Sequence, residues 1–128
     1  MLRDGSDVAI IATGLMVAEA VEAAKTLAEA GISARVINIC TIKPLDEELV
    51  VKAAKETGAI VTAENHNVTC GLGSVVANCL SRNAPTVQEF VGVQDQFGQV
   101  GPQDFLMDEY GLRAANIVAA VKKAIARK

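Results

Sequence analysis

Hydrophobic and polar positions follow two alternating patterns along the chain. Short apolar runs bounded by Gly, Pro or charged residues predict four strands, at 8–13, 34–39, 59–64 and 86–93. Apolar residues spaced three and four apart predict helices, at 15–30, 47–57, about 71–82, 103–109 and 113–126. Helices between strands imply crossover connections. We therefore expect an α/β fold with helices on both faces of a mostly parallel sheet, in which an edge strand, the first or the last, could run antiparallel.

The length and composition fit one such unit. The chain has 128 residues, of which 51% are apolar and only 3% are aromatic. Ala, Val, Ile and Leu must therefore fill the interior, as they do where helices pack on buried strands. We expect residues 1–128 to form a single domain.

Charge and hydropathy argue against two classes of partner. Twelve Lys and Arg residues against fifteen Asp and Glu residues give a net charge of −3, and there is no basic stripe interleaved with aromatics for binding nucleic acid. Apolar runs such as the one at 8–18 are about half the ~20 residues that cross a bilayer, and the N-terminus lacks the hydrophobic segment of a signal peptide. We expect a cytoplasmic protein that binds neither nucleic acid nor membrane.

Three cysteines accompany the one His of the chain. Cys40, Cys70 and Cys79 lack the CxxC spacing of a zinc site, and with His66 as the single histidine they cannot make a four-ligand zinc site from neighbouring pairs. We interpret all three as free thiols and expect this chain to hold no metal.

The stretch TAENHNVTCGLGSVVA, residues 62–77, holds the candidate chemistry. It follows the third predicted strand and opens a helix, and ligands of parallel sheets gather at the carboxyl ends of strands. Gly71 and Gly73 would let a phosphate or carboxylate approach the N–H groups at the helix start, helped by Ser74. Alternatively, the glycines let the helix pack closely on the strand. Val76 stands where a GxGxxG motif has its third glycine, so the motif is incomplete.

Glu64 and His66 are two residues apart, so on an extended segment they point the same way. His66 would act as a general acid or base if Glu64 held its other ring nitrogen. The sequence has no GxSxG motif and no second His, so the alternative is a His that hydrogen-bonds locally at a surface or interface. The corresponding alternative for Glu64 is a strand-end acid solvated at the rim of the sheet.

Asp95 lies in a second polar loop, which follows the fourth predicted strand. This loop reaches the same edge of the sheet if that strand is parallel. Alternatively, Asp95 shapes the loop because its side chain accepts hydrogen bonds from the backbone N–H groups of the residues that follow it. We assign no bond-making role to any of these residues. The candidates for anion binding or a domain interface are Glu64, His66, Gly71, Gly73, Ser74 and Asp95.

Four segments together resemble a known family. They are DVAIIATG (7–14), RVINICTIKPLD (35–46), TAENHNVTCGLGSVVA (62–77) and GVQDQFGQVGPQDFLMDEYGL (92–112). They look like the C-terminal domain of transketolase and cover nearly the whole chain in order. The same domain occurs in looser form in deoxyxylulose-phosphate synthase and in the β-subunit of 2-oxo-acid dehydrogenase E1 components.

The resemblance implies a sheet of five strands, mostly parallel with one antiparallel strand. It also implies transfer of a two-carbon ketol unit between sugar phosphates, with thiamine diphosphate and magnesium in the complete enzyme. Family members hold the diphosphate through the metal on a GDG motif followed by Asn, and their middle domain supplies the carboxylate that activates the cofactor. This chain has only Asp4-Gly5. We therefore expect it to bind no cofactor and to be inactive alone.

On this interpretation the chain supports assembly. Its partners would be the remaining transketolase domains or subunit, and it would make homodimer contacts. Three alternatives remain open. The chain could be the C-terminal domain of deoxyxylulose-phosphate synthase or of an E1 β-subunit, a free-standing module that binds a regulatory anion on the Gly71–Ser74 turn, or a docking domain for a lipoyl carrier.

Overall fold

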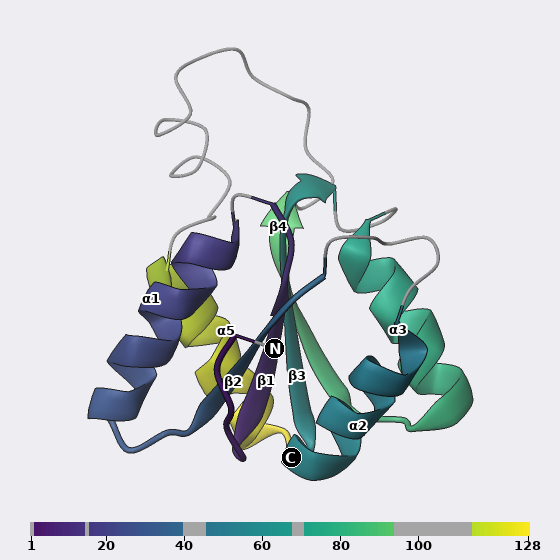
Figure 1. Cartoon of the computed structure of the whole chain (residues 1–128), viewed down its shortest axis with the longest axis horizontal. Coiled ribbons are helices and arrows are strands. Elements are labelled where there is room, and N and C mark those ends of the chain that lie inside the picture. Colours follow the sequence, from purple (N-terminus) through teal and green to yellow (C-terminus); the bar gives the residue numbers. More distant parts are fainter. Residues whose placement is uncertain (1, 15, 40–45, 68–70, 94–113) are drawn as a thin grey trace.

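The structure, a computed structural model, describes residues 2–14, 16–39, 46–67, 71–93 and 114–128. Its strands are β1 (Val8–Ala12), β2 (Ala34–Asn38), β3 (Ala59–Asn67) and β4 (Val87–Val93). Its helices are α1 (Met16–Glu29), α2 (Glu47–Thr57), α3 (Leu72–Asn83) and α5 (Ala114–Ala126). These elements form three layers, with the sheet between two pairs of helices (Figure 1).

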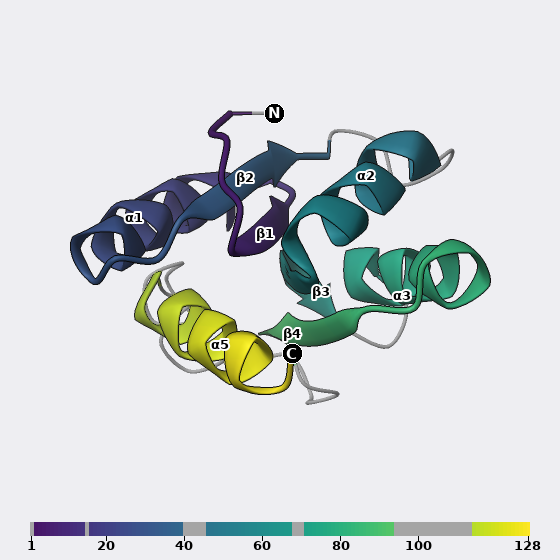
Figure 2. The same cartoon turned by 90° about the horizontal axis from the view of Figure 1, so that it is seen from below.

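The sheet places the two strands that come first in the chain beside each other. Its strand order is β2-β1-β3-β4, and every neighbouring pair is parallel. Helices α1 and α5 cover one face and contact each other, while α2 and α3 form the same kind of pair on the other face (Figure 2). The carboxyl ends of all four strands therefore lie at one edge of the sheet, as predicted for an α/β fold.

Strand β1 lies in the middle of the core. All five of its residues are fully buried. Val8, Ile10 and Ala12 belong to the apolar cluster with α1 and α5, whereas Ala9 and Ile11 belong to the cluster with α2 and α3. Because successive side chains of a strand point to opposite faces, burial on both faces requires an unbroken apolar run.

The sheet differs from the prediction in its strands. The described residues form four strands, all parallel, so the expected five strands with one antiparallel strand are not found there. The physical reason is that β2, β3 and β4 each follow a helix, and a helical crossover brings the chain back in the same direction. Antiparallel pairing within the described residues is confined to an isolated bridge between Arg3 and Val36.

Two predicted segments, the loop at 94–102 and the helix at 103–109, lie outside the described residues. None of the described helices is long and apolar enough to span a bilayer.

Helix α2 begins and ends at the residues that its sequence signals indicate. The Asp46 side chain accepts a hydrogen bond from the Leu49 N–H at 3.2 Å, and Glu47 and Glu48 place negative charge in the first turn. The helix ends at Gly58, whose φ of 76° lies in the left-handed region that favours glycine.

Replacing Asp46 with alanine is expected to lower the free energy of unfolding by about 1 kcal/mol, because the Leu49 N–H loses its acceptor. Asp46→Asn keeps an acceptor oxygen at the same position, so it should cost clearly less. Urea denaturation followed by circular dichroism measures both values. Equal losses in the two variants would contradict a capping role for the Asp46 side chain.

Candidate functional site

The candidate site lies where β3 leaves the sheet and α3 begins. Thr62 and Glu64 stand on the same face of β3 as the core residue Ile60, toward α2 and α3. Both polar side chains belong to fully buried residues. A buried carboxylate needs strong hydrogen-bond donors to replace its lost hydration.

Helix α3 supplies those donors. The Leu72 N–H lies 2.7 Å from Oε1 of Glu64, and the Gly73 N–H lies 2.6 Å from Oε2. The N-cap residue, Gly71, has no side chain to cap the helix, and the first turn of α3 carries no acid. Glu64 therefore caps α3 from another element, where its negative charge complements the positive end of the helix dipole.

The peptide groups around Gly73 are held on several sides. Its N–H donates to Glu64, while its carbonyl accepts a hydrogen bond of 3.0 Å from Nε2 of Gln88 in β4. The same Nε2 donates to Oγ1 of Thr62 at 3.2 Å. A Cβ atom at Gly73 would lie only 2.5 Å from Cδ2 of Phe90 and 3.1 Å from Oγ1 of Thr62. Glycine is required here because α3 approaches the sheet too closely for a side chain.

The structure brings three predicted site residues together. Glu64, Gly71 and Gly73 meet at the start of α3, and Ser74 lies in its first turn. The interpretation of Glu64 as a solvated acid at the rim is wrong, because β3 continues past it to Asn67 and keeps it inside. His66 lies in this continuation of β3.

The pairing of Glu64 with His66 stays a prediction, because the His66 side chain is outside the described part of the structure. Both oxygens of Glu64 already accept hydrogen bonds from α3. Asp95 is also outside the described residues, so its role stays a prediction.

The anion-binding role of the Gly71–Ser74 turn also stays a prediction. An external anion would have to compete with the Glu64 carboxylate for the Leu72 and Gly73 N–H groups. The close contact of Gly73 with Phe90 is what the alternative, close packing of helix on strand, requires.

Sequence reasoning missed the contributions of Thr62, Gln88 and Phe90. The available signal was a polar residue within each of two strands, Thr62 in β3 and Gln88 in β4. Polar side chains in buried strands need partners, so they indicate specific hydrogen bonds. The sequence alone does not say that both bonds meet at Gly73.

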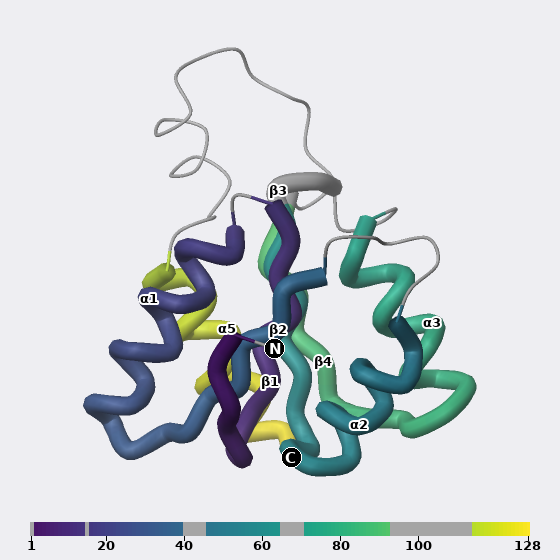
Figure 3. The backbone as a smooth tube through the Cα atoms, in the orientation of Figure 1, coloured from purple at the N-terminus to yellow at the C-terminus, as the bar shows by residue number. Residues whose placement is uncertain are grey.

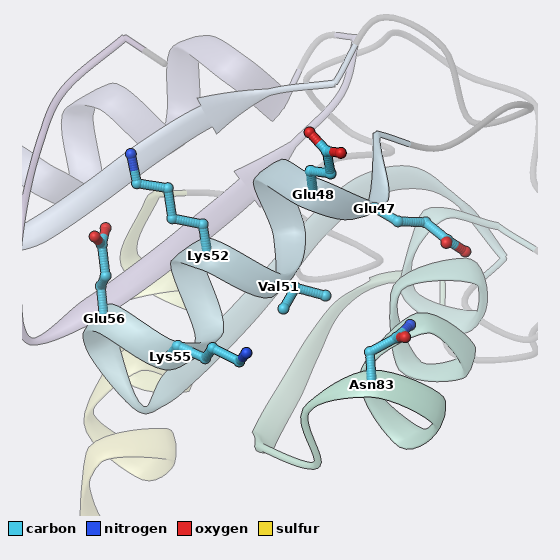
Figure 4. A pocket seen from close by; sticks show the side chains of 7 residues that line it. All are labelled: Glu47, Glu48, Val51, Lys52, Lys55, Glu56 and Asn83. Atoms are coloured by element: carbon cyan, nitrogen blue, oxygen red, sulfur yellow. The ribbon is translucent and has the colours of Figure 1, made fainter.

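A surface groove of about 610 Å³ lies apart from this cluster, along the outer face of α2 (Figure 4). Its lining residues are Glu47, Glu48, Val51, Lys52, Lys55, Glu56 and Asn83. Acidic and basic side chains are mixed along it, and Glu47 is paired with Arg82 at 2.9 Å. Three acids and two lysines around an open groove give it no dominant charge with which to select a ligand.

The described residues contain no group of three or more His, Cys, Asp or Glu side chains that could hold a metal ion. Cys79 is a free thiol on the buried face of α3. Burial raises the pKa of this thiol, and the negative charge of Glu47 raises it further. Cys79 is therefore protonated at neutral pH and is a poor nucleophile.

These features define the class of protein. It is a three-layer α/β domain in which the Glu64 carboxylate accepts hydrogen bonds from the N–H groups at the start of α3, the helix that follows β3. Residues 1–117 match the family described as "Transketolase, C-terminal domain". The chain belongs to this family.

Individual relatives are similar over the whole chain. The chain is 52% identical over 128 residues to the 6-deoxy-6-sulfo-D-fructose transketolase subunit SqwH of Clostridium sp. (strain MSTE9), covering 100% of this chain and 40% of that protein. It is 45% identical to 1-deoxy-D-xylulose-5-phosphate synthase 1 of Geobacter sulfurreducens, covering 100% of this chain and 20% of that protein.

A solved structure has the same fold. It is described as "Split gene transketolase, inactive beta4 tetramer" and superimposes with a TM-score of 0.93 at 51% sequence identity. The match covers 98% of this chain and 41% of that one. The chain thus spans between 20% and 41% of the length of these three relatives.

Proposed function

We propose that the chain acts as the C-terminal part of a transketolase and supports assembly of a cytoplasmic enzyme that transfers a two-carbon ketol unit between sugar phosphates. The observation that carries this proposal is the similarity over 98% or more of the chain to a transketolase subunit and to a split-gene transketolase, at 52% and 51% identity. The arrangement around Glu64 supports it, because the polar groups at the strand end bind one another and stabilise the fold.

Thiamine diphosphate and magnesium belong, on this proposal, to the complete enzyme. The donor groups at the start of α3 do not fit the cofactor's diphosphate, because the buried Glu64 carboxylate already occupies two of them and would repel a second anion. No metal-binding cluster is formed by the part of the chain that the structure describes. The chemistry of the cofactor is therefore assigned to polypeptide other than these residues.

The proposed partners are the remaining transketolase domains or subunit, together with a second copy of the chain in a homodimer. The related structure described as an inactive β4 tetramer supports the view that assembly among such subunits alone does not produce activity.

A chimaera tests the proposal. This chain would replace the matching 128 residues of the Clostridium subunit, co-expressed with the rest of that enzyme. We expect the chimaera to assemble and to regain two-carbon transfer, whereas the isolated chain should show neither turnover nor thiamine diphosphate binding by calorimetry. Saturable coenzyme binding by the isolated chain, or a folded chimaera that assembles but stays inactive, would contradict the proposal.

The 45% identity to a deoxyxylulose-phosphate synthase supports a second candidate, in which the chain completes that enzyme. The same replacement made in the Geobacter protein distinguishes the two. Recovery of synthase activity in that chimaera, without recovery of ketol transfer in the first, would favour the second candidate.

A further inference from the structure

The segment before β1 lies along the outer edge of the sheet. Strand β2 is an outer strand in the order β2-β1-β3-β4, and residues 2–7, the N-terminal arm, run beside it, as can be followed in Figure 3. Val36 accepts a hydrogen bond of 2.9 Å from the Leu2 N–H and donates one of 2.9 Å to the Arg3 carbonyl. The arm thus binds both backbone groups that Val36 turns away from β1.

The start of the edge is held as well. The Asp7 N–H donates to the Ser33 carbonyl at 2.9 Å, and the Ser33 N–H donates to Oδ2 of Asp7 at 2.7 Å. Between these two points the arm touches the strand itself. A Cβ atom at Gly5 would lie 2.4 Å from the Ala34 carbonyl carbon. Gly5 therefore lets the arm lie closer to β2 than any other residue would allow.

Arg35 links the arm to α2. It is only 8% exposed, although it lies on an outer strand. Its guanidinium binds Asp4 of the arm at 3.2 Å and Glu56 of α2 at 2.8 Å. Arginine suits this place because its planar head carries several fixed donors and can bind two carboxylates at once. A lysine would offer a single charged centre.

We propose that the N-terminal arm, held in place by the ion pairs of Arg35, covers the β2 edge and so prevents it from pairing with the β2 edge of a second copy of this chain. Outer strands present unpaired backbone groups that accept another strand. The arm itself shows that this edge binds an extended segment in antiparallel orientation. Two β2 edges related by a twofold axis would meet in that same orientation. This role does not depend on the proposed function.

A comparison of two variants of the full chain that lose the same charge tests whether the ion pairs of Arg35 hold the arm on β2. Arg35→Ala removes the link between the arm and α2, whereas Arg3→Ala removes the same charge from an arm residue that binds Val36 through its backbone N–H and carbonyl groups. In Arg35→Ala we expect the Val36 and Asp7 amides to exchange with deuterium about tenfold faster than in the wild type. In Arg3→Ala their rates should stay unchanged. Equal exchange rates in the two variants would contradict the role of Arg35 in holding the arm.

Analytical ultracentrifugation tests whether the arm prevents self-association of the chain. Arg35→Ala should show a higher weight-average mass than the wild-type chain at the same concentration, increasing with concentration. Gly5→Val, which displaces the arm by steric contact and leaves every charge in place, should show the same gain. This second variant decides the question if Arg35→Ala also accelerates exchange in β1. Faster deuterium exchange of the Val36 and Asp7 amides with no gain in weight-average mass would contradict the proposal that the arm prevents pairing of β2 edges.

Discussion

Replacing Glu64 with alanine is expected to lower the free energy of unfolding by about 4 kcal/mol. The substitution removes two hydrogen bonds to an ionised acceptor, each of which contributes about 1.5–3 kcal/mol. It also leaves the Leu72 and Gly73 N–H groups without partners inside the protein. Urea denaturation at neutral pH, followed by circular dichroism, measures the loss.

Two further variants separate the role of the carboxylate from a general loss of an acid. Glu64→Gln keeps the shape and one acceptor oxygen, so about half of the effect should remain. Glu48→Ala removes an exposed glutamate from α2 and should change the free energy of unfolding by less than about 0.5 kcal/mol. If Glu64→Ala behaved like Glu48→Ala, the carboxylate would not be holding α3.

The importance of Glu64 follows from what α3 lacks. Helix α2 has its own cap in Asp46 and acids in its first turn, but α3 begins at a glycine with neither. Helix α5 is held in a similar way to α3, because the Ala114 N–H donates to Glu19 of α1 at 2.9 Å. In both cases a glutamate from another element binds the helix N-terminus and also fixes the distance between the two elements.

This difference explains how much of the fold could be predicted. The bounds 47–57 predicted for α2 agree with the structure, because its cap, charges and terminal glycine are all local signals. The predicted strand at 8–13 and helix at 15–30 agree within one residue at each end, since apolar spacing alone defines them. The family resemblance was confirmed over residues 1–117.

The parts that were wrong or missed depend on distant contacts. Strand β3 was expected to end at Glu64 but continues to Asn67, where it still pairs with Val93 of β4. Polar residues such as Asn65 and Asn67 give no local signal for a strand, so only pairing with β4 extends it. For the same reason the burial of Glu64 could not be predicted from its charge, which favours exposure unless partners are present.

Gly73→Ala provides the second large effect, an expected loss of about 2 kcal/mol in the free energy of unfolding. In a helix, alanine is normally about 1 kcal/mol better than glycine. Here the new Cβ would lie 2.5 Å from the Phe90 ring, and overpacking of this kind costs about 1–3 kcal/mol. A net loss therefore measures the contact with Phe90, since helix propensity alone predicts a gain.

A double-mutant cycle assigns that loss to the ring. When Phe90 is also replaced with alanine, Gly73→Ala should become stabilising by about 1 kcal/mol, as helix propensity alone predicts, giving a coupling energy of about 3 kcal/mol between the two sites. Ser81→Ala, at an exposed position of α3, serves as the matched control and should be neutral or slightly stabilising. If Gly73→Ala cost as much without the ring as with it, the close approach of α3 to β4 would not be the reason for glycine at this position.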